Sequence, residues 1–179
     1  MNVKEVNKHP EKSIILKNLD GKIHYMDSYQ IDIINKNDPS IDYITGLIFL
    51  SPPKWMKRLG RLRDLIVKPF GLKTGVFTEP KLPGKSIRYN IGDMIGFFPV
   101  IDRSESEIVM AENDKHLYFR VSVLLRNNPD SGSHSIYVTT IVQFHSILGK
   151  IYFVPVKPFH KIIVKNILKN LASFTIAQK

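Results

Sequence analysis

Apolar and polar positions alternate with a period of two through most of the second half of the chain. The runs that show this alternation are residues 97–102, 107–113, 116–125 and 135–145. A period of two is typical of strands with one buried and one exposed face. The connections are short and rich in turn formers, as in Asn128-Pro129-Asp130-Ser131-Gly132. Short connections favour antiparallel pairing, so these runs predict an antiparallel meander.

The part of the chain before the meander predicts one strand followed by two short helices. Residues 22–33 are rich in β-favouring side chains. Asp38 with Pro39 indicates an N-cap and first turn for a helix that ends before Ser51-Pro52-Pro53. A second, strongly basic helix then runs to about Lys68, because proline fits a first turn but breaks a helix interior. We expect mainly loop over 71–96.

The last element is a long helix over residues 148–174, with one apolar stripe and one lysine stripe. Pro155 and Pro158 should delay or kink its first turns, because each lacks a backbone N–H. The order of elements predicts an α+β fold in which a curved antiparallel sheet wraps around the long C-terminal helix. We expect a flexible segment over 1–20 and a single domain over 21–176.

The interior of this domain is expected to lie between the C-terminal helix and the strands over 97–145. The side chains assigned to it are Phe119, Val138, Val142, Val156 and Ile163. A single long helix lying across a curved sheet covers most of its apolar face. This order of elements resembles helix-grip folds, which commonly leave a cavity there, and the resemblance implies an apolar pocket between the helix and the sheet.

Composition and charge narrow the classes of function. The 179 residues contain no cysteine, which excludes disulfides and thiolate chemistry. No apolar run near the N-terminus is typical of an export signal, so we expect a cytoplasmic protein. The net charge is +10, and residues 132–179 hold six lysines and no acidic residue. Aromatic residues are not interleaved with the basic ones, so we expect no nucleic acid and only weak contact with an anionic membrane surface.

Polar side chains alternate along the run 116–125. They are His116, Tyr118, Arg120 and Ser122, and they share one face of the predicted strand. Two orientations are open. In the usual one the polar face meets water and the apolar face meets the core. In the other, part of the polar face points inward, and Arg120 is then a buried cation that needs a carboxylate or an anionic head group as its partner.

A second candidate for a site is His160, which lies within the apolar stripe of the last helix. A packed, hydrogen-bonded histidine is the common explanation, but an imidazole that faces a cavity can also orient a ligand or transfer a proton. The expected ligand-binding residues are His116, Tyr118, Arg120, Thr140, His145, Tyr152 and His160. No motif has the spacing of a metal site or of a nucleotide-binding turn, so we expect neither metal nor cofactor.

Several motifs resemble, in order, a bacterial family catalogued as domain of unknown function 2867 (DUF2867). They include Phe70-Gly71-Leu72-Lys73-Thr74-Gly75, Gly92-Asp93-Met94-Ile95-Gly96-Phe97-Phe98, Asp114-Lys115-His116-Leu117-Tyr118-Phe119-Arg120 and Pro158-Phe159-His160. The order of elements also resembles the helix-grip architecture of the START-like (SRPBCC) superfamily. Related segments occur fused behind short-chain dehydrogenase-like domains, and this resemblance implies a role near small-molecule metabolism.

The leading hypothesis is a module that binds a small hydrophobic or lipid-like molecule in the cavity between sheet and helix. One alternative is an enzyme of cyclase, dehydratase or hydrolase type that uses His116 or His160 for acid–base chemistry. Another is an accessory module for an oxidoreductase of the short-chain dehydrogenase type. The sequence does not choose an oligomeric state.

Overall fold

A computed structural model describes residues 2–7, 9–34, 39–50, 84, 86–96, 98–129 and 132–177, with side chains to residue 173. The strands are β1 (Lys4–Val6), β2 (Tyr25–Ile33), β3 (Met94–Ile95), β4 (Phe98–Arg103), β5 (Glu107–Asn113), β6 (Leu117–Asn128) and β7 (Ser133–Phe144). The helices are the 3-10 helix η1 (Ile14–Leu16), α1 (Ile41–Leu50) and α3 (Ile147–Ala177). The second predicted helix, 52–68, and most of the predicted loop 71–96 lie outside the described residues.

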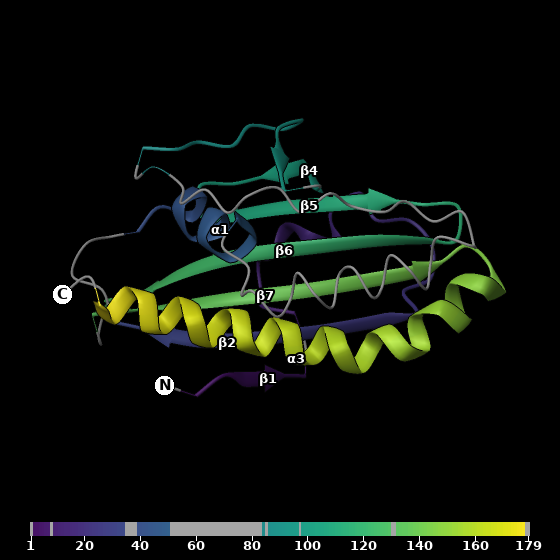
Figure 1. The fold of residues 1–179 in the computed structure, drawn as a ribbon. Coiled ribbons are helices and arrows are strands. Elements are labelled where there is room, and N and C mark those ends of the chain that lie inside the picture. Colours follow the sequence, from purple (N-terminus) through teal and green to yellow (C-terminus); the bar gives the residue numbers. More distant parts are fainter. Residues whose placement is uncertain are drawn as a thin grey trace.

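The strands form one seven-stranded sheet in the order β1-β2-β7-β6-β5-β4-β3, and every neighbouring pair is antiparallel. The α+β class and the antiparallel meander are therefore confirmed. The long β6–β7 hairpin forms the centre, and β2 pairs with β7, so the first long strand joins the last. Figure 1 shows α3 lying along one face of this sheet, with α1 on the same face near β5 and β6.

Helix α1 begins later than the sequence predicts. The Ser40 hydroxyl accepts a hydrogen bond from the backbone N–H of Tyr43 at 3.1 Å, which is the bond of an N-cap residue. Ser40 therefore takes the role that was predicted for Asp38, and the helix starts at Ile41. Ile41, Ile44 and Ile48 are buried on the side that joins the core.

The main core lies between the sheet and the two helices. From the sheet, Tyr29, Ile31, Val121 and Ile136 are buried in it, and α3 contributes side chains such as Leu168. Of the predicted interior residues, Val138 and Val142 are buried, and Phe119 packs partly buried against the core. Val156 and Ile163 of α3 are partly exposed.

The opposite face of the sheet is covered by the N-terminal segment. Ile15 of η1 is fully buried against Val109 and Ile141, and β1 adds a strand to the edge next to β2. Residues 1–20, expected to be flexible, thus contribute a strand and a short helix. The sequence does not predict these two elements, because each has three residues and is too short to show a periodic pattern.

Helix α3 is continuous from Ile147, and Pro155 and Pro158 lie inside it rather than ahead of it. Both prolines are exposed, so water can hydrogen-bond the carbonyl groups that lose their helical partners. The predicted delay of the helix start is therefore wrong. Among the described residues, no helix combines the length and the hydropathy needed to cross a bilayer.

Candidate functional site

The structure separates the predicted site residues into three places. Thr140 and His160 lie on the face of the sheet that α3 covers. Tyr118 and Arg120 belong to the opposite face, under the N-terminal segment. The remaining residues, His116, His145 and Tyr152, lie around the connection from β7 to α3. The first group lies with further polar side chains beneath α3, next to the main core.

A polar cluster lies beneath α3, and it consists of Tyr25, Asp27, Tyr29, Thr140 and His160. Nε2 of His160 is 3.3 Å from Oδ1 of Asp27, and their side chains are 15% and 3% exposed. The Tyr25 hydroxyl donates a 2.5 Å hydrogen bond to the other carboxylate oxygen of Asp27. Asp27 is directly opposite Thr140 in the β2–β7 pairing. The cluster therefore joins α3 to two central strands.

Two buried hydroxyl groups of the polar cluster are unsatisfied. Oγ1 of Thr140 and the hydroxyl of Tyr29 have no hydrogen-bond partner among the described residues. A buried polar atom without a partner costs about 1–3 kcal/mol, and such atoms are rare in folded proteins. These two hydroxyls therefore mark where the polar cluster lacks a hydrogen-bond partner among the described residues.

The tyrosines of the cluster stay protonated across the ordinary pH range. Burial raises the pKa of Tyr25, and its hydrogen bond to Asp27 and the charge of that carboxylate raise it further. The pKa of Tyr29 is raised by burial and by the negative charge of Asp27, although the two side chains do not form a hydrogen bond of good geometry. Both hydroxyls consequently act as hydrogen-bond donors.

A row of aromatic rings leads from α1 to the polar cluster. The rings of Phe49, Phe98 and Phe119 follow one another with centroid separations of 5.9 and 5.4 Å. Phe119 is edge-on to His160 at 6.4 Å, and Tyr25 is edge-on to His160 at 6.5 Å. Phe98, Phe119 and Tyr25 are only partly buried. The polar cluster thus adjoins a partly accessible apolar surface, which we call the aromatic row.

Lysines of α3 surround the other side of the cluster. Nζ of Lys157 lies 5.0 Å from the ring centroid of Tyr25, and Nζ of Lys165 lies 5.3 Å from that of Tyr29. Lys161 donates a 2.8 Å hydrogen bond to Glu5, and this bond lowers the pKa of the Glu5 carboxyl against the opposing effect of burial. The edge of the cluster near β1 therefore carries positive charge.

The N-terminal segment covers the middle of the polar face of β6, where Arg120 and Ser122 are buried. Nη1 of Arg120 donates to the carbonyl oxygens of Ile15 at 2.7 Å and Lys17 at 2.9 Å. The partner expected for a buried Arg120 was a carboxylate or a head group, but backbone carbonyls take that place. The apolar face, with Val121 and Val123, lies in the main core as the usual orientation predicts.

Glu107 is the carboxylate that holds the N-terminal segment on this face. It is 1% exposed. It accepts hydrogen bonds from the Ser13 hydroxyl and the Ile14 N–H, each at 2.7 Å, and from the Ser122 hydroxyl. Ser122 and Arg120 thus serve the packing of the N-terminal segment on the sheet.

The histidines near the start of α3 hold the connections at that end of the sheet. Nδ1 of His116 is 3.2 Å from the Ser146 hydroxyl, and Nε2 of His145 is 2.9 Å from Oδ1 of Asn113. Gly149 brings the first turn of α3 close to this connection, since a Cβ there would lie 2.1 Å from the carbonyl oxygen of His116. His116 and His145 are not in contact with the polar cluster in any described interaction.

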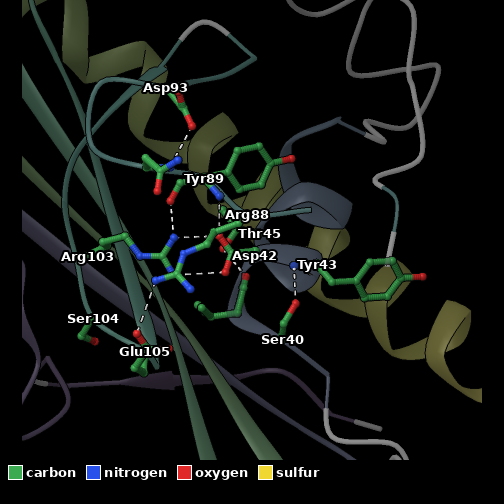
Figure 2. A network of polar contacts seen from close by, with 12 residues as sticks. Ser40, Asp42, Tyr43, Thr45, Arg88, Tyr89, Asp93, Arg103, Ser104 and Glu105 are labelled. Carbon is green, nitrogen blue, oxygen red and sulfur yellow. Dashed lines mark hydrogen bonds and ion pairs between the residues drawn. The ribbon is translucent and has the colours of Figure 1, made fainter. Parts of the chain in front are cut away.

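A second polar network lies at the start of α1 (Figure 2). Arg103 forms a two-point ion pair with Asp42, with N–O distances of 3.0 and 3.2 Å, and Asp42 also accepts from the N–H of Tyr89 at 2.6 Å. This network borders a cavity of about 760 Å³ whose lining includes Ser40, Arg88, Leu125 and Arg126.

The cations beside this cavity already have partners. Arg103 is paired with Asp42, Arg88 is 3.6 Å from Glu105, and Arg126 donates to the carbonyl oxygen of Glu11. The Tyr89 hydroxyl of this network is also buried without a partner among the described residues, whereas the polar cluster has two such hydroxyls beside the Asp27–His160 contact.

Sequence reasoning missed Tyr25, Asp27 and Tyr29. The signal was present, since these residues share one strand face with Ile31 and Ile33. A carboxylate on an otherwise apolar strand face needs a partner, and His160 is that partner. The pairing itself needs the position of α3 over β2, which sequence spacing does not give.

One family model matches the chain, and its description is "Protein of unknown function (DUF2867)". The match covers residues 19–167 and so includes both Asp27 and His160. No curated protein and no solved structure matches the chain.

Proposed function

The chain belongs to the DUF2867 family of proteins of unknown function, and we propose that it binds a small hydrophobic or lipid-like molecule between the sheet and α3. The observation that carries this proposal is the pair of unsatisfied hydroxyls, Thr140 Oγ1 and the Tyr29 hydroxyl, beside the Asp27–His160 contact. A ligand atom that accepts from them would remove the cost of burying them without a partner.

The aromatic row supports an apolar body for the ligand. Binding sites for small molecules are mostly apolar, with a few polar groups that fix the orientation. Phe98 and Phe119 supply partly accessible ring faces next to His160. The body of the ligand would lie along these rings, and its head group would reach Thr140 and Tyr29.

The chemistry of the head group follows from the donors that remain. The Tyr29 hydroxyl stays protonated and donates, whereas the Thr140 hydroxyl can donate or accept. An oxygen atom of a carbonyl, carboxyl or alcohol group fits both. Lys157 and Lys165 at the edge of the cluster favour a neutral or negatively charged head group over a positively charged one.

The order of elements supports a helix-grip fold of the START-like type as part of the same proposal. Two strands with a 3-10 helix between them, then α1, the rest of the antiparallel sheet and a long C-terminal helix across its face occur here in that order. In that architecture the region between sheet and long helix is where a ligand fits.

The test is binding of a dansyl-labelled undecanoic acid, followed by fluorescence and by displacement with unlabelled decanoic acid. Tyr29→Phe and Thr140→Val should each weaken binding about five- to tenfold, since each removes one hydrogen bond to the head group. Tyr89→Phe is the matched control, because Tyr89 also carries a buried hydroxyl without a partner, but lies in the α1 network.

Native mass spectrometry of the freshly purified protein adds an assay that needs no chosen probe. A bound apolar molecule that is lost in the Thr140→Val variant and kept in Tyr89→Phe supports the proposal. Equal affinity of all variants for the labelled acid, together with no bound molecule in the wild type, would show that the polar cluster does not bind a ligand.

The Asp27–His160 contact also favours a second candidate, an enzyme that uses His160 for acid–base chemistry. A carboxylate 3.3 Å from an imidazole nitrogen can orient the ring for proton transfer. Conversion of the co-purified molecule by wild type, but not by His160→Gln, would distinguish catalysis from binding alone. A molecule recovered unchanged from both proteins would exclude turnover of that compound.

A further inference from the structure

The first half of α3 exposes an unusual number of large apolar side chains. Six of them are each between 47% and 78% exposed. The residues, which we call the α3 stripe, are Ile147, Leu148, Ile151, Val154, Phe159 and Ile162. Single exposed apolar residues are normal on a protein surface, but a contiguous group of this size marks an interaction surface.

The α3 stripe follows one side of the helix. At the 100° step of an α-helix, the six residues of the stripe fall within an arc of about 140°, and Ile147, Ile151 and Ile162 fall within about 60° at its middle. Phe153 and Val164, which α3 buries, lie about 150–170° from the centre of this arc. The stripe is therefore not the edge of the core but a second apolar face on the outward side of the helix.

The charge around the α3 stripe identifies its partner. Residues 132–179 contain six lysines and no acidic residue, and Lys150 and Lys157 accompany the stripe on the same half of α3. The described contacts place two carboxylates against α3: Glu5, which pairs with Lys161 and Lys165, and Asp27, which is buried beside His160 on the side that faces the sheet. The surroundings of the stripe are therefore positive.

An anionic lipid surface fits both the apolar side chains of the α3 stripe and the positive charge around them. Apolar side chains of an interfacial helix enter the boundary between head groups and acyl chains, while flanking lysines meet lipid phosphates. A second copy of this chain fits less well, because it would bring two sets of lysines together on a protein whose net charge is already +10.

We propose that the α3 stripe attaches this protein to membranes that contain anionic lipid, with the first half of α3 lying in the plane of the interface. This proposal does not depend on the proposed ligand, since the stripe and His160 lie on different sides of α3. The apolar contribution makes attachment only partly sensitive to salt, whereas contact through lysines alone would be lost at physiological ionic strength.

The experiment is co-sedimentation with vesicles of phosphatidylcholine alone and of phosphatidylcholine mixed with phosphatidylserine. The double variant Ile151→Gln, Val154→Gln should lose about tenfold or more in affinity for the mixed vesicles, because two exposed apolar side chains no longer enter the lipid. Ile91→Gln with Met94→Gln is the matched control, since both residues are similarly exposed outside α3. Lys150→Gln should reduce the preference for phosphatidylserine, and Lys157 is left unchanged because its Nζ lies 5.0 Å from the Tyr25 ring centroid in the polar cluster.

Three results would overturn the proposal. The first is equal pelleting of wild type and stripe variant. The second is a wild type that runs as a dimer in size-exclusion chromatography while the stripe variant runs as a monomer, which would assign the stripe to a second copy. The third is a clearly lower melting temperature of the stripe variant, which would mean that the stripe is covered by the chain itself. Ligand affinity should stay unchanged in every stripe variant, so failure here is distinct from failure of the proposed function.

Discussion

Replacing Asp42 with asparagine should destabilise the protein far more than most single substitutions do. Asp42 and Arg103 are 8% and 11% exposed, and they are joined by two hydrogen bonds of 3.0 and 3.2 Å (Figure 2). Asparagine keeps an oxygen that can accept from the Tyr89 N–H, but it removes the charge that compensates the guanidinium. Arg103 is then a buried cation whose remaining acceptors, the carbonyl oxygen of Tyr89 and the amide oxygen at position 42, are both neutral.

The expected magnitude follows from this burial. Removing one partner of a buried ion pair costs about 3–5 kcal/mol, and the lower end applies because one acceptor is kept. For a domain of this size, about 3 kcal/mol corresponds to a fall of about 6–12 °C in melting temperature. Asp42→Leu combined with Arg103→Met should cost less than the sum of the two single changes, because no charge is left without a partner.

The assay is urea unfolding followed by circular dichroism, with the four proteins of a double-mutant cycle. The pair Arg88–Glu105 provides the control, because its side chains are 63% and 90% exposed at a separation of 3.6 Å. Breaking an exposed pair of this kind costs about 0–1 kcal/mol. If Asp42→Asn loses no more free energy of unfolding than Arg88→Ala does, the burial argument is wrong.

Three further substitutions test other parts of the structure. Glu107→Gln should lower the melting temperature and speed proteolysis within residues 9–20, because the amide N–H₂ of the glutamine would face donors such as the Ile14 N–H. An unchanged rate of cleavage would contradict the role of Glu107. Hydrogen bonds from Ser135 and Gln30 lower the pKa of Asp32 despite burial, so its stabilising effect is present above the unfolded pKa of about 3.9 and lost as pH falls through the lower folded pKa. Asp32→Asn should therefore lose free energy of unfolding at pH 7 and little at pH 2, and an equal loss at both would refute this sign. Val142→Asp should abolish cooperative unfolding, since Val142 is fully buried and an unpaired charge there costs several kcal/mol; a wild-type-like melting curve would contradict the core assignment.

The bounds of the meander strands could be predicted closely from the sequence, because the two faces of each strand have different surroundings. The predicted run 107–113 coincides with β5, and the other three agree with their strands to within a few residues. The hairpin connection around Gly132 also lies where its turn residues predict, and this glycine has a positive φ of 57°. Local periodicity is enough for such elements, because it records which side chains face the core.

The candidate site was only half predictable, because its residues are joined by tertiary pairing. Thr140 and His160 were expected to bind a ligand, and they do share the face beneath α3. Asp27 comes from a strand more than 100 residues earlier, and it reaches Thr140 only through the β2–β7 pairing. Arg120 was predicted to belong to the same site, but it lies on the other face of the sheet, where it donates to the carbonyl oxygen of Ile15 in the N-terminal segment. No pattern in a segment of this length predicts that it will cover a sheet.

The two proposals concern opposite faces of the same half of α3, and this arrangement predicts whether they are coupled. The second half of α3 is fixed to the core by Val164, Leu168 and Leu171, whereas the first half buries Phe153 and turns His160 inward. If the first half moves as a rigid extension of the second, lipid vesicles should leave the affinity for the dansyl-labelled acid unchanged. If the first half is instead displaced from the sheet when the α3 stripe enters lipid, His160 must separate from Asp27. Vesicles should then weaken binding of the acid by the wild type but not by the Ile151→Gln, Val154→Gln variant. The few buried contacts of the first half favour the second outcome, because little burial has to be given up for that half to move. Equal affinities of wild type and variant in the presence of vesicles would refute this coupling.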